Sequence, residues 1–227
     1  MLLHFRITAD GSHTLYVPEL DEHYHSMNGA VSESMLVFIK NGFRYINPGH
    51  TIVFEMGFGT GLNVLLTWIE AERDGRSVTC HSIERYPLPQ DTVDRLNYPA
   101  ILGGDSGQMM ERIHSAPWNR TVALSPLFSL KKIEGDMHHF EAEEMYHVVY
   151  FDAFAPGKQP DVWTGEIFRK IYRMMVPGGV LTTYSSKSMV RHRLAEAGFV
   201  TETLPGPKGK REVTRAIKPG FEDYFKS

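Results

Sequence analysis

From residue 51 onward, the pattern of apolar and polar positions predicts strands that alternate with helices. Short runs rich in β-branched and aromatic residues predict strands at 51–56, 78–83, 121–124, 128–133, 147–151, 180–184, 199–204 and 212–217. Amphipathic or capped stretches predict helices at 62–73, 90–96, 161–175 and 189–197. This alternation predicts an α/β fold with a mostly parallel sheet and helices on both faces. The last two strands are separated only by a loop, which predicts an antiparallel C-terminal edge.

The first fifty residues have a less regular pattern. Asp10-Gly11 marks a turn, and 14–17 is expected to be a strand. After that, two interpretations stay open. One is a short helix over 32–39 with Ser32 as its N-cap, and the other is a hairpin around Asn41-Gly42. We therefore divide the chain into an N-terminal extension, 1–50, and a main domain, 51–227.

Composition limits the class of protein. The chain has 227 residues, 42% of them hydrophobic and 22% charged, as in ordinary globular proteins with one full core. No apolar run approaches the roughly 18 residues that cross a bilayer, and the N-terminus lacks a signal-peptide core. A single cysteine, Cys80, excludes an internal disulfide and favours a reducing cytoplasm. The eleven histidines show no metal-ligand spacing, so no metal is predicted.

Charge is unevenly distributed along the chain. The net charge is −3, but residues 187–218 hold eight Lys or Arg against three Glu, which leaves −8 for the rest. A basic patch on an acidic body suits a protein that touches nucleic acid at one edge. A solvated basic face would give the same pattern, and charge alone does not separate the two.

A glycine loop follows the strand predicted at 51–56. Its glycines are Gly57, Gly59 and Gly61, where close backbone approach to a ligand is possible. A dinucleotide fingerprint would need G-x-G-x-x-G, but position 62 is Leu. The G-x-G-x-G pattern, with Glu55 two positions before it, resembles motif I of class I S-adenosylmethionine-dependent methyltransferases.

Two acids support an adenosyl ligand. Glu84 ends the next predicted strand and can accept ribose hydroxyls. Asp136 follows the strand at 128–133 and is preferred as the acid beside the adenine over Asp105, which no convincing strand precedes. The predicted cofactor site comprises Glu55, Gly57, Phe58, Gly59, Thr60, Gly61, Asn63, Glu84, Asp136 and Met137.

The strand at 147–151 leads into a loop rich in proline and aromatic residues. Asp152 stands at the carboxyl end of this strand, where open α/β sheets bind ligands. Phe154 and Trp163 would wall a flat substrate. Trp163 has an equal alternative as a core anchor for the helix that follows.

Several segments together resemble one family. They are 24–38, 55–63, 82–88, 135–136, 151–163, 177–179, 196–199 and 208–212. The chain resembles the methyltransferase domain of the MnmC family, including its stand-alone MnmD-like members. The most specific signature is Phe151 to Lys158 followed by Pro-Asp-x-Trp, although Ala153 stands where a glycine is common. The implied fold is the Rossmann-like fold of class I methyltransferases.

The resemblance implies an activity and a set of partners. The implied reaction is S-adenosylmethionine-dependent N-methylation of 5-aminomethyl-(2-thio)uridine at the tRNA wobble position, U34. Asp152 would orient or deprotonate the amine, and the basic loop at 208–211 would hold phosphates of the anticodon stem-loop. Since the chain ends at Ser227, no flavin-dependent oxidase domain is expected. The implied substrate-binding residues, some of them in the N-terminal extension, are Tyr24, Asn28, Phe154, Lys158, Pro160, Trp163, Lys208, Lys210 and Arg211.

Three alternatives remain at this point. Two are enzymes with related ligands, a small-molecule amine N-methyltransferase and an aminopropyltransferase. The third is a non-catalytic scaffold that binds cofactor or RNA. The intact glycine loop and Asp152 argue against the scaffold.

Overall fold

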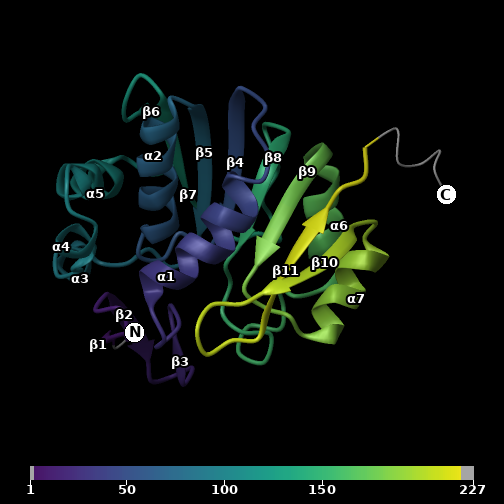
Figure 1. Ribbon diagram of the computed structural model, residues 1–227, viewed down its shortest axis with the longest axis horizontal. Helices are drawn as coiled ribbons and strands as arrows, with labels where there is room; N and C mark the ends of the chain where they lie inside the picture. The colour runs from purple at the N-terminus through teal and green to yellow at the C-terminus, as the bar shows by residue number, and fades with distance from the viewer. Residues whose placement is uncertain (1–2, 221–227) are drawn as a thin grey trace.

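A computed structural model describes residues 3–220. Its centre is an eight-stranded sheet in the order β10-β11-β9-β8-β4-β5-β7-β6 (Figure 1). Strands β7, β5, β4, β8 and β9 are parallel. The predicted mostly parallel α/β sheet is therefore confirmed. The strands are β4 His50–Met56, β5 Ser77–Glu84, β6 Thr121–Ala123, β7 Phe128–Glu134, β8 Tyr146–Phe151, β9 Met175–Thr183, β10 Val200–Pro205 and β11 Glu212–Ile217.

Both edges of the sheet carry antiparallel pairs. The predicted C-terminal hairpin is confirmed, with β10 and β11 paired from Val200↔Ile217 to Pro205↔Glu212. The strand that runs against the parallel set, β11, lies between β9 and the edge strand β10. At the other edge β6 pairs antiparallel with β7.

Alternate residues of the central strands face two separate hydrophobic clusters. Val53 and Val148 pack in one cluster, with α2, α5 and η1, whereas Phe54 and Val149 pack in the other, with α6 and α7. This period of two places a helical layer on each face of the sheet. α2 crosses in front of β5 and β7 (Figure 1). The helices are α1 Ala30–Ser34, η1 Met35–Phe43, α2 Leu62–Asp74, α3 Gln90–Val93, α4 Tyr98–Leu102, α5 Ser106–Ser115, α6 Gly165–Arg173 and α7 Ser188–Glu196.

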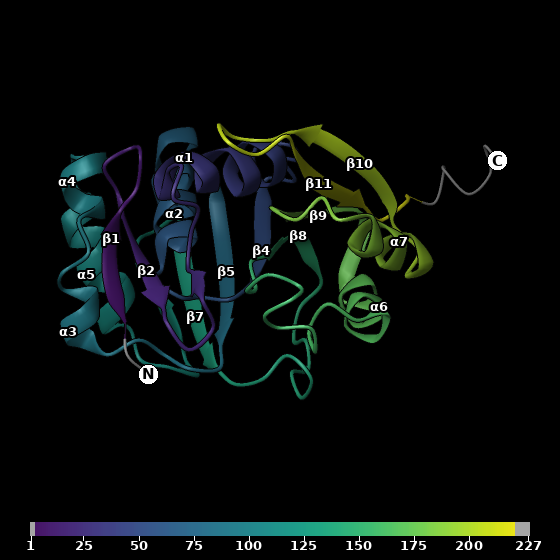
Figure 2. The ribbon, with the colours of Figure 1, turned by 90° about the horizontal axis from the view of Figure 1, so that it is seen from below.

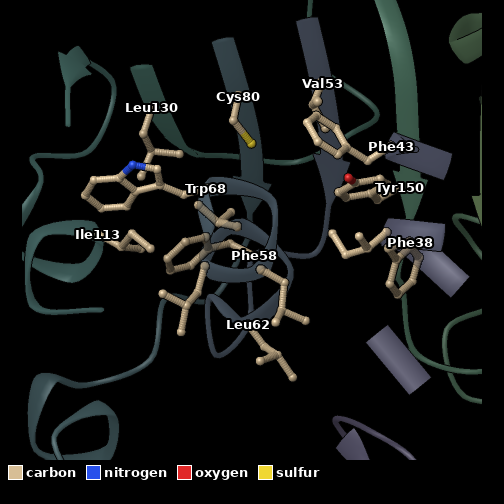
Figure 3. Packing of buried hydrophobic residues seen from close by; sticks show 14 of the residues in the cluster. Phe38, Phe43, Val53, Phe58, Leu62, Trp68, Cys80, Ile113, Leu130 and Tyr150 are labelled. Atoms are coloured by element: carbon tan, nitrogen blue, oxygen red, sulfur yellow. The ribbon is translucent and has the colours of Figure 1, made fainter. Parts of the chain in front are cut away.

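The first cluster forms the larger part of the core. Phe38 and Phe43 from η1 approach Tyr150 of β8, while Trp68 of α2 lies beside β5 and β7 (Figure 3). The Trp68 ring stacks on Phe128 with 5.5 Å between ring centroids. Burial of these aromatic surfaces fixes α2 and η1 against the sheet, and thereby fixes the loop that precedes α2.

The N-terminal segment forms a small sheet and then a helix. β1 His4–Ile7, β2 His13–Val17 and β3 Glu22–His23 make a three-stranded antiparallel sheet, which lies beside α3, α4 and α5 (Figure 2). Only the strand at β2 was predicted. α1 runs directly into η1, a π-helix.

The structure decides between the two interpretations of this region. The hairpin around Asn41-Gly42 is wrong, because both residues lie buried in η1. The helical interpretation holds, but its start is corrected: the N-cap is Gly29 rather than Ser32. The Ser32 hydroxyl instead donates to Oδ2 of Asp10 at 2.8 Å, so it ties the helix to the turn at residue 10.

Other element bounds also differ from the prediction. α6 is shorter than 161–175 because Thr164 caps it, accepting a hydrogen bond from the Ile167 amide at 3.3 Å. The strand predicted at 180–184 begins earlier, so residues 177–179 lie inside β9. α3 stops at Val93, and α4 and α5 were not predicted. Among the described residues, no helix has the length and apolarity needed to cross a membrane.

Candidate active site

A pocket of about 740 Å³ opens at the carboxyl ends of β4, β5, β7 and β8. Residues 19, 20 and 22–27 of the N-terminal segment form part of its wall. This is the edge where open α/β sheets bind ligands. Of the predicted site residues, those that line it are Tyr24, Gly57, Phe58, Gly59, Thr60, Asn63, Glu84, Asp136, Met137, Asp152, Phe154, Lys158 and Lys210.

The glycine loop packs tightly against neighbouring backbone. Gly57 has φ +94°, and a Cβ there would collide with the Asp152 carbonyl oxygen. Gly59 has φ +49°, and a Cβ there would lie 3.2 Å from the Tyr24 ring. Gly61 has φ +75° and is the N-cap of α2. The loop therefore needs glycine for two reasons: its backbone has positive φ angles, and the Asp152 carbonyl and the Tyr24 ring leave little room for side chains.

The two acids predicted to bind the adenosyl group, Glu84 and Asp136, line the same pocket as the loop. Glu84 lies at the end of β5, where its carboxylate accepts hydrogen bonds from the amides of Gly59 at 3.0 Å and Tyr86 at 2.9 Å. Asp136 follows β7, and Nη1 of Arg85 lies 3.1 Å from its Oδ2. Neither Arg85 nor Tyr86 was predicted. The glycine cradle and the Glu84 carboxylate together fit the methionyl and ribose parts of S-adenosylmethionine.

Asp152 directly follows β8, and its backbone amide donates to the Met56 carbonyl at 3.0 Å. Its Oδ2 accepts a hydrogen bond from Asn63 Nδ2 at 2.8 Å. Burial raises the pKa of Asp152 to about 7, while the Asn63 hydrogen bond opposes the rise. A carboxyl group with a pKa near neutrality can accept a proton and later release it.

Glu55 takes a different position from the one predicted. Its side chain is fully buried under the loop, with Ser82 Oγ bonded to its Oε2, and it does not line the pocket. Burial raises the pKa of Glu55 to about 8, so the neutral acid dominates at pH 7. Asn63, also predicted as a cofactor ligand, lines the pocket but bonds to Asp152.

Trp163 is a core anchor and does not wall the pocket. Its side chain is fully buried, and its ring centroid lies 4.7 Å from that of Phe151. Trp163 Nε1 donates to the Phe154 carbonyl at 2.7 Å, which fixes the loop after Asp152. The Phe154 ring does face the pocket, in edge contact with Tyr24 at 5.1 Å.

The basic residues of the loop between β10 and β11 do not all face the pocket. Lys210 points into the pocket, where its Nζ lies 2.7 Å from Oε2 of Glu33. Lys208 and Arg211 are exposed and lie outside the pocket. Two further predicted substrate residues also lie outside: Asn28, whose side chain packs on Gly209, and the exposed Pro160.

Glu33 and Tyr184 line the pocket but were not among the predicted site residues. The Tyr184 hydroxyl donates to the Ala153 carbonyl at 2.8 Å, beside Asp152. Tyr184 follows β9, the neighbour of β8, so its place at the carboxyl edge was a usable signal. Glu33 lies in the segment 24–38 that carries the family resemblance, but its place in the pocket depends on a helix start that the sequence misplaced. In the chain from residue 3 to 220, no group of three or more His, Cys, Asp or Glu could hold a metal ion.

Comparison with known proteins agrees with this geometry. A family model described as S-adenosyl-L-methionine-dependent methyltransferase matches residues 110–219. The tRNA 5-methylaminomethyl-2-thiouridine biosynthesis bifunctional protein MnmC of Pseudomonas entomophila (strain L48) is 29% identical over 97% of this chain and 36% of that protein. The MnmC of Pseudomonas putida (strain GB-1) is 31% identical over 94% of this chain and 35% of that protein. The chain thus spans just over a third of the length of these relatives.

Solved structures agree as well. The crystal structure of MNMC2 from Aquifex aeolicus is 26% identical, with a TM-score of 0.76, over 99% of this chain and 75% of that one. Spermidine synthase from Thermotoga maritima, 12% identical with a TM-score of 0.60, shares the fold alone. The predicted Rossmann-like class I fold and the S-adenosylmethionine cofactor are confirmed. The chain is an S-adenosyl-L-methionine-dependent methyltransferase that is similar, over nearly its whole length, to one part of the MnmC proteins.

Proposed function

We propose that this methyltransferase transfers a methyl group to the amine of 5-aminomethyl-(2-thio)uridine at the tRNA wobble position, giving 5-methylaminomethyl-(2-thio)uridine. The observation that carries the proposal is Asp152, a carboxyl with a pKa of about 7 beside the glycine cradle. The MnmC relatives are named for biosynthesis of 5-methylaminomethyl-2-thiouridine in tRNA. An amine acceptor needs a group of this kind, because it arrives mostly protonated.

The pocket has two ends, one proposed to bind the cofactor and the other to bind the amine acceptor. Gly57, Gly59 and Glu84 would hold the cofactor, which supplies an activated sulfonium methyl group. Asp152 would receive the ammonium group and take one proton from it, leaving a lone pair on nitrogen. That lone pair forms the new N–C bond as the C–S bond breaks, so alignment of the two ends supplies much of the rate.

The acceptor end has an aromatic wall. Phe154 and Tyr24 contact each other edge to face, and Tyr184 lines the same pocket. Aromatic surfaces of this kind accept an unstacked base. We therefore extend the proposal to the N-terminal extension, 1–50, which contributes Tyr24 and Glu33 to this end. The anticodon stem-loop is the proposed RNA partner, and the cytoplasm is the proposed location.

The direct test is incubation of the purified protein with S-adenosylmethionine and tRNA that carries 5-aminomethyluridine. Nucleoside mass spectrometry should detect one added methyl group at the wobble uridine. Parallel reactions with free amines, and with polyamines plus decarboxylated cofactor, test the two enzymatic alternatives. A free amine or polyamine product without any tRNA product would contradict the proposal.

A further inference from the structure

Lys210 carries a fixed positive charge into the pocket from the loop between β10 and β11. Its Nζ lies 2.7 Å from Oε2 of Glu33 and 4.4 Å from the centre of the Tyr184 ring. The Glu33 side chain is only 10% exposed and that of Lys210 30%, so water screens this pair less than a surface ion pair. A carboxylate and an aromatic face together hold the ammonium in one place.

This charge belongs to a cluster around Asp152. The groups that interact with Asp152 are Glu33 from α1, Glu55 from β4, Asn63 from α2, Tyr98 from α4, Tyr184 after β9 and Lys210. Glu33 raises the pKa of Asp152, and Lys210 lowers it. If Lys210 were neutral, Glu33 would face Asp152 without compensation, and Asp152 would keep its proton to higher pH.

The same charge acts on the amine that would enter the pocket. An ammonium group cannot attack, because its lone pair holds a proton. Carboxylates nearby stabilise the ammonium form, and a cation nearby favours the free amine. A pocket with several acids therefore needs a compensating cation if the amine is to release its proton to Asp152.

We propose that Lys210, held by Glu33 and Tyr184, is a positioning residue that balances the charge of the acceptor end, so that Asp152 is ionised and the bound amine becomes neutral. This inference rests on the proposed function. It gives Lys210 a different role from Lys208 and Arg211, which are exposed and are proposed to bind RNA phosphates. It also gives Glu33 a role, to anchor Lys210 within range of both reacting groups.

The test compares Lys210→Met, Lys210→Arg and the double variant Glu33→Gln/Lys210→Met, with Lys208→Met as a control from the same loop. Carbon-13 carboxyl NMR follows the titration of Asp152 in each free protein, with Asp152→Asn used to assign the signal. Single-turnover methyl transfer to aminomethyluridine tRNA is measured from pH 6 to 9. Folding is checked by the thermal midpoint of each variant.

In Lys210→Met, the Asp152 titration and the acid limb of methyl transfer should both move to higher pH. The rate constant at pH 6 should fall roughly 10-fold, the low end for loss of a nearby opposite charge. Lys210→Arg should restore the parent's Asp152 titration and its pH profile of methyl transfer. The double variant should return the Asp152 titration toward that of the parent. Lys208→Met should leave the Asp152 titration unchanged.

An unmoved Asp152 titration in folded Lys210→Met would overturn the inference, and so would an equal shift in Lys208→Met, which would indicate a general charge effect. A parent protein that does not methylate the tRNA would instead contradict the proposed function. In that case the NMR titration would still decide whether Lys210 sets the ionisation of Asp152.

Discussion

Asn63 Nδ2 lies 2.8 Å from Oδ2 of Asp152, so the first turn of α2 holds the acid that follows β8. The same turn begins at the glycine loop, which links the cofactor cradle to the proposed proton acceptor. A hydrogen bond to the carboxylate favours its charged form and lowers its pKa. The two ends of the reaction are thus held by one short piece of helix.

Replacing Asn63 with Leu should therefore raise the pKa of Asp152 and move the acid limb of methyl transfer to higher pH. Thr67→Val is the matched control, because it removes the hydrogen bonds of Thr67 Oγ1 with the Asn63 carbonyl at 2.6 Å and the Tyr150 hydroxyl at 3.1 Å but leaves the Asn63 side chain in place. Both variants should lose roughly 1–3 kcal/mol of stability from unpaired buried groups. Only Asn63→Leu should shift the pH profile. Superimposable profiles for Asn63→Leu and the parent would contradict this role.

Glu55→Gln should change how stability depends on pH. The pKa of Glu55 is raised from 4.5 to about 8 in the folded protein, so the folded state binds a proton more tightly than the unfolded chain does. The stability that this proton contributes is complete below pH 4.5 and is lost as pH rises through 8. Glutamine mimics the neutral acid at every pH. Urea denaturation at pH 9 should find the variant more stable than the parent, by an amount of the order of a few kcal/mol. The same parent–variant difference at pH 4 and pH 9 would argue against a protonated Glu55.

Gly59→Leu should abolish binding of S-adenosylmethionine in titration calorimetry. A Cβ at Gly59 already lies 3.2 Å from the Tyr24 ring, so a larger side chain fills the space between the loop and the N-terminal segment. Gly157→Leu is the control, since Gly157 is exposed and a Cβ there meets no atom within 4 Å. Equal affinities for the parent and Gly59→Leu would remove the loop from the cofactor site.

Neutralising Lys208 and Arg211 should weaken tRNA binding and leave cofactor binding unchanged. Both side chains are exposed, so removing their charge weakens the hold on RNA phosphates without disturbing the pocket. The slope of log K against log salt should fall by roughly 0.7 for each phosphate of a single strand that the protein no longer neutralises. A salt slope equal to that of the parent would mean that these residues are an ordinary solvated face.

The parallel sheet and the residues at its carboxyl edge could be predicted because strand periodicity and strand ends are local features. Glu84 ends β5, and Asp136 and Asp152 follow β7 and β8, so the strand ends pointed to these three acids. α5 was missed although its buried residues, Ser106, Met110 and Ile113, follow the helical spacing. η1 could not be decided between a helix and a hairpin, because its buried residues run almost continuously over 37–43 and do not mark one helical face.

The errors in the candidate site have a common cause, which is that sequence does not tell which way a side chain faces. Trp163 and Glu55 lie beside the site in sequence, but both point into the interior. One basic run contains Lys208, Lys210 and Arg211. Only Lys210 points into the pocket, where it forms an ion pair with Glu33. Glu33 is 177 positions away from Lys210, so no local pattern could pair them.

The most direct measurement of the central claim is single-turnover methyl transfer by Asp152→Asn to tRNA that carries 5-aminomethyluridine, from pH 6 to 9. The asparagine keeps an oxygen that can accept the Asn63 hydrogen bond, so folding and cofactor binding should change little. The variant cannot take a proton from the amine, and the rate constant should fall by roughly 10²-fold or more. A folded Asp152→Asn protein that binds cofactor and methylates this tRNA at a rate near that of the parent across the whole range would contradict the account.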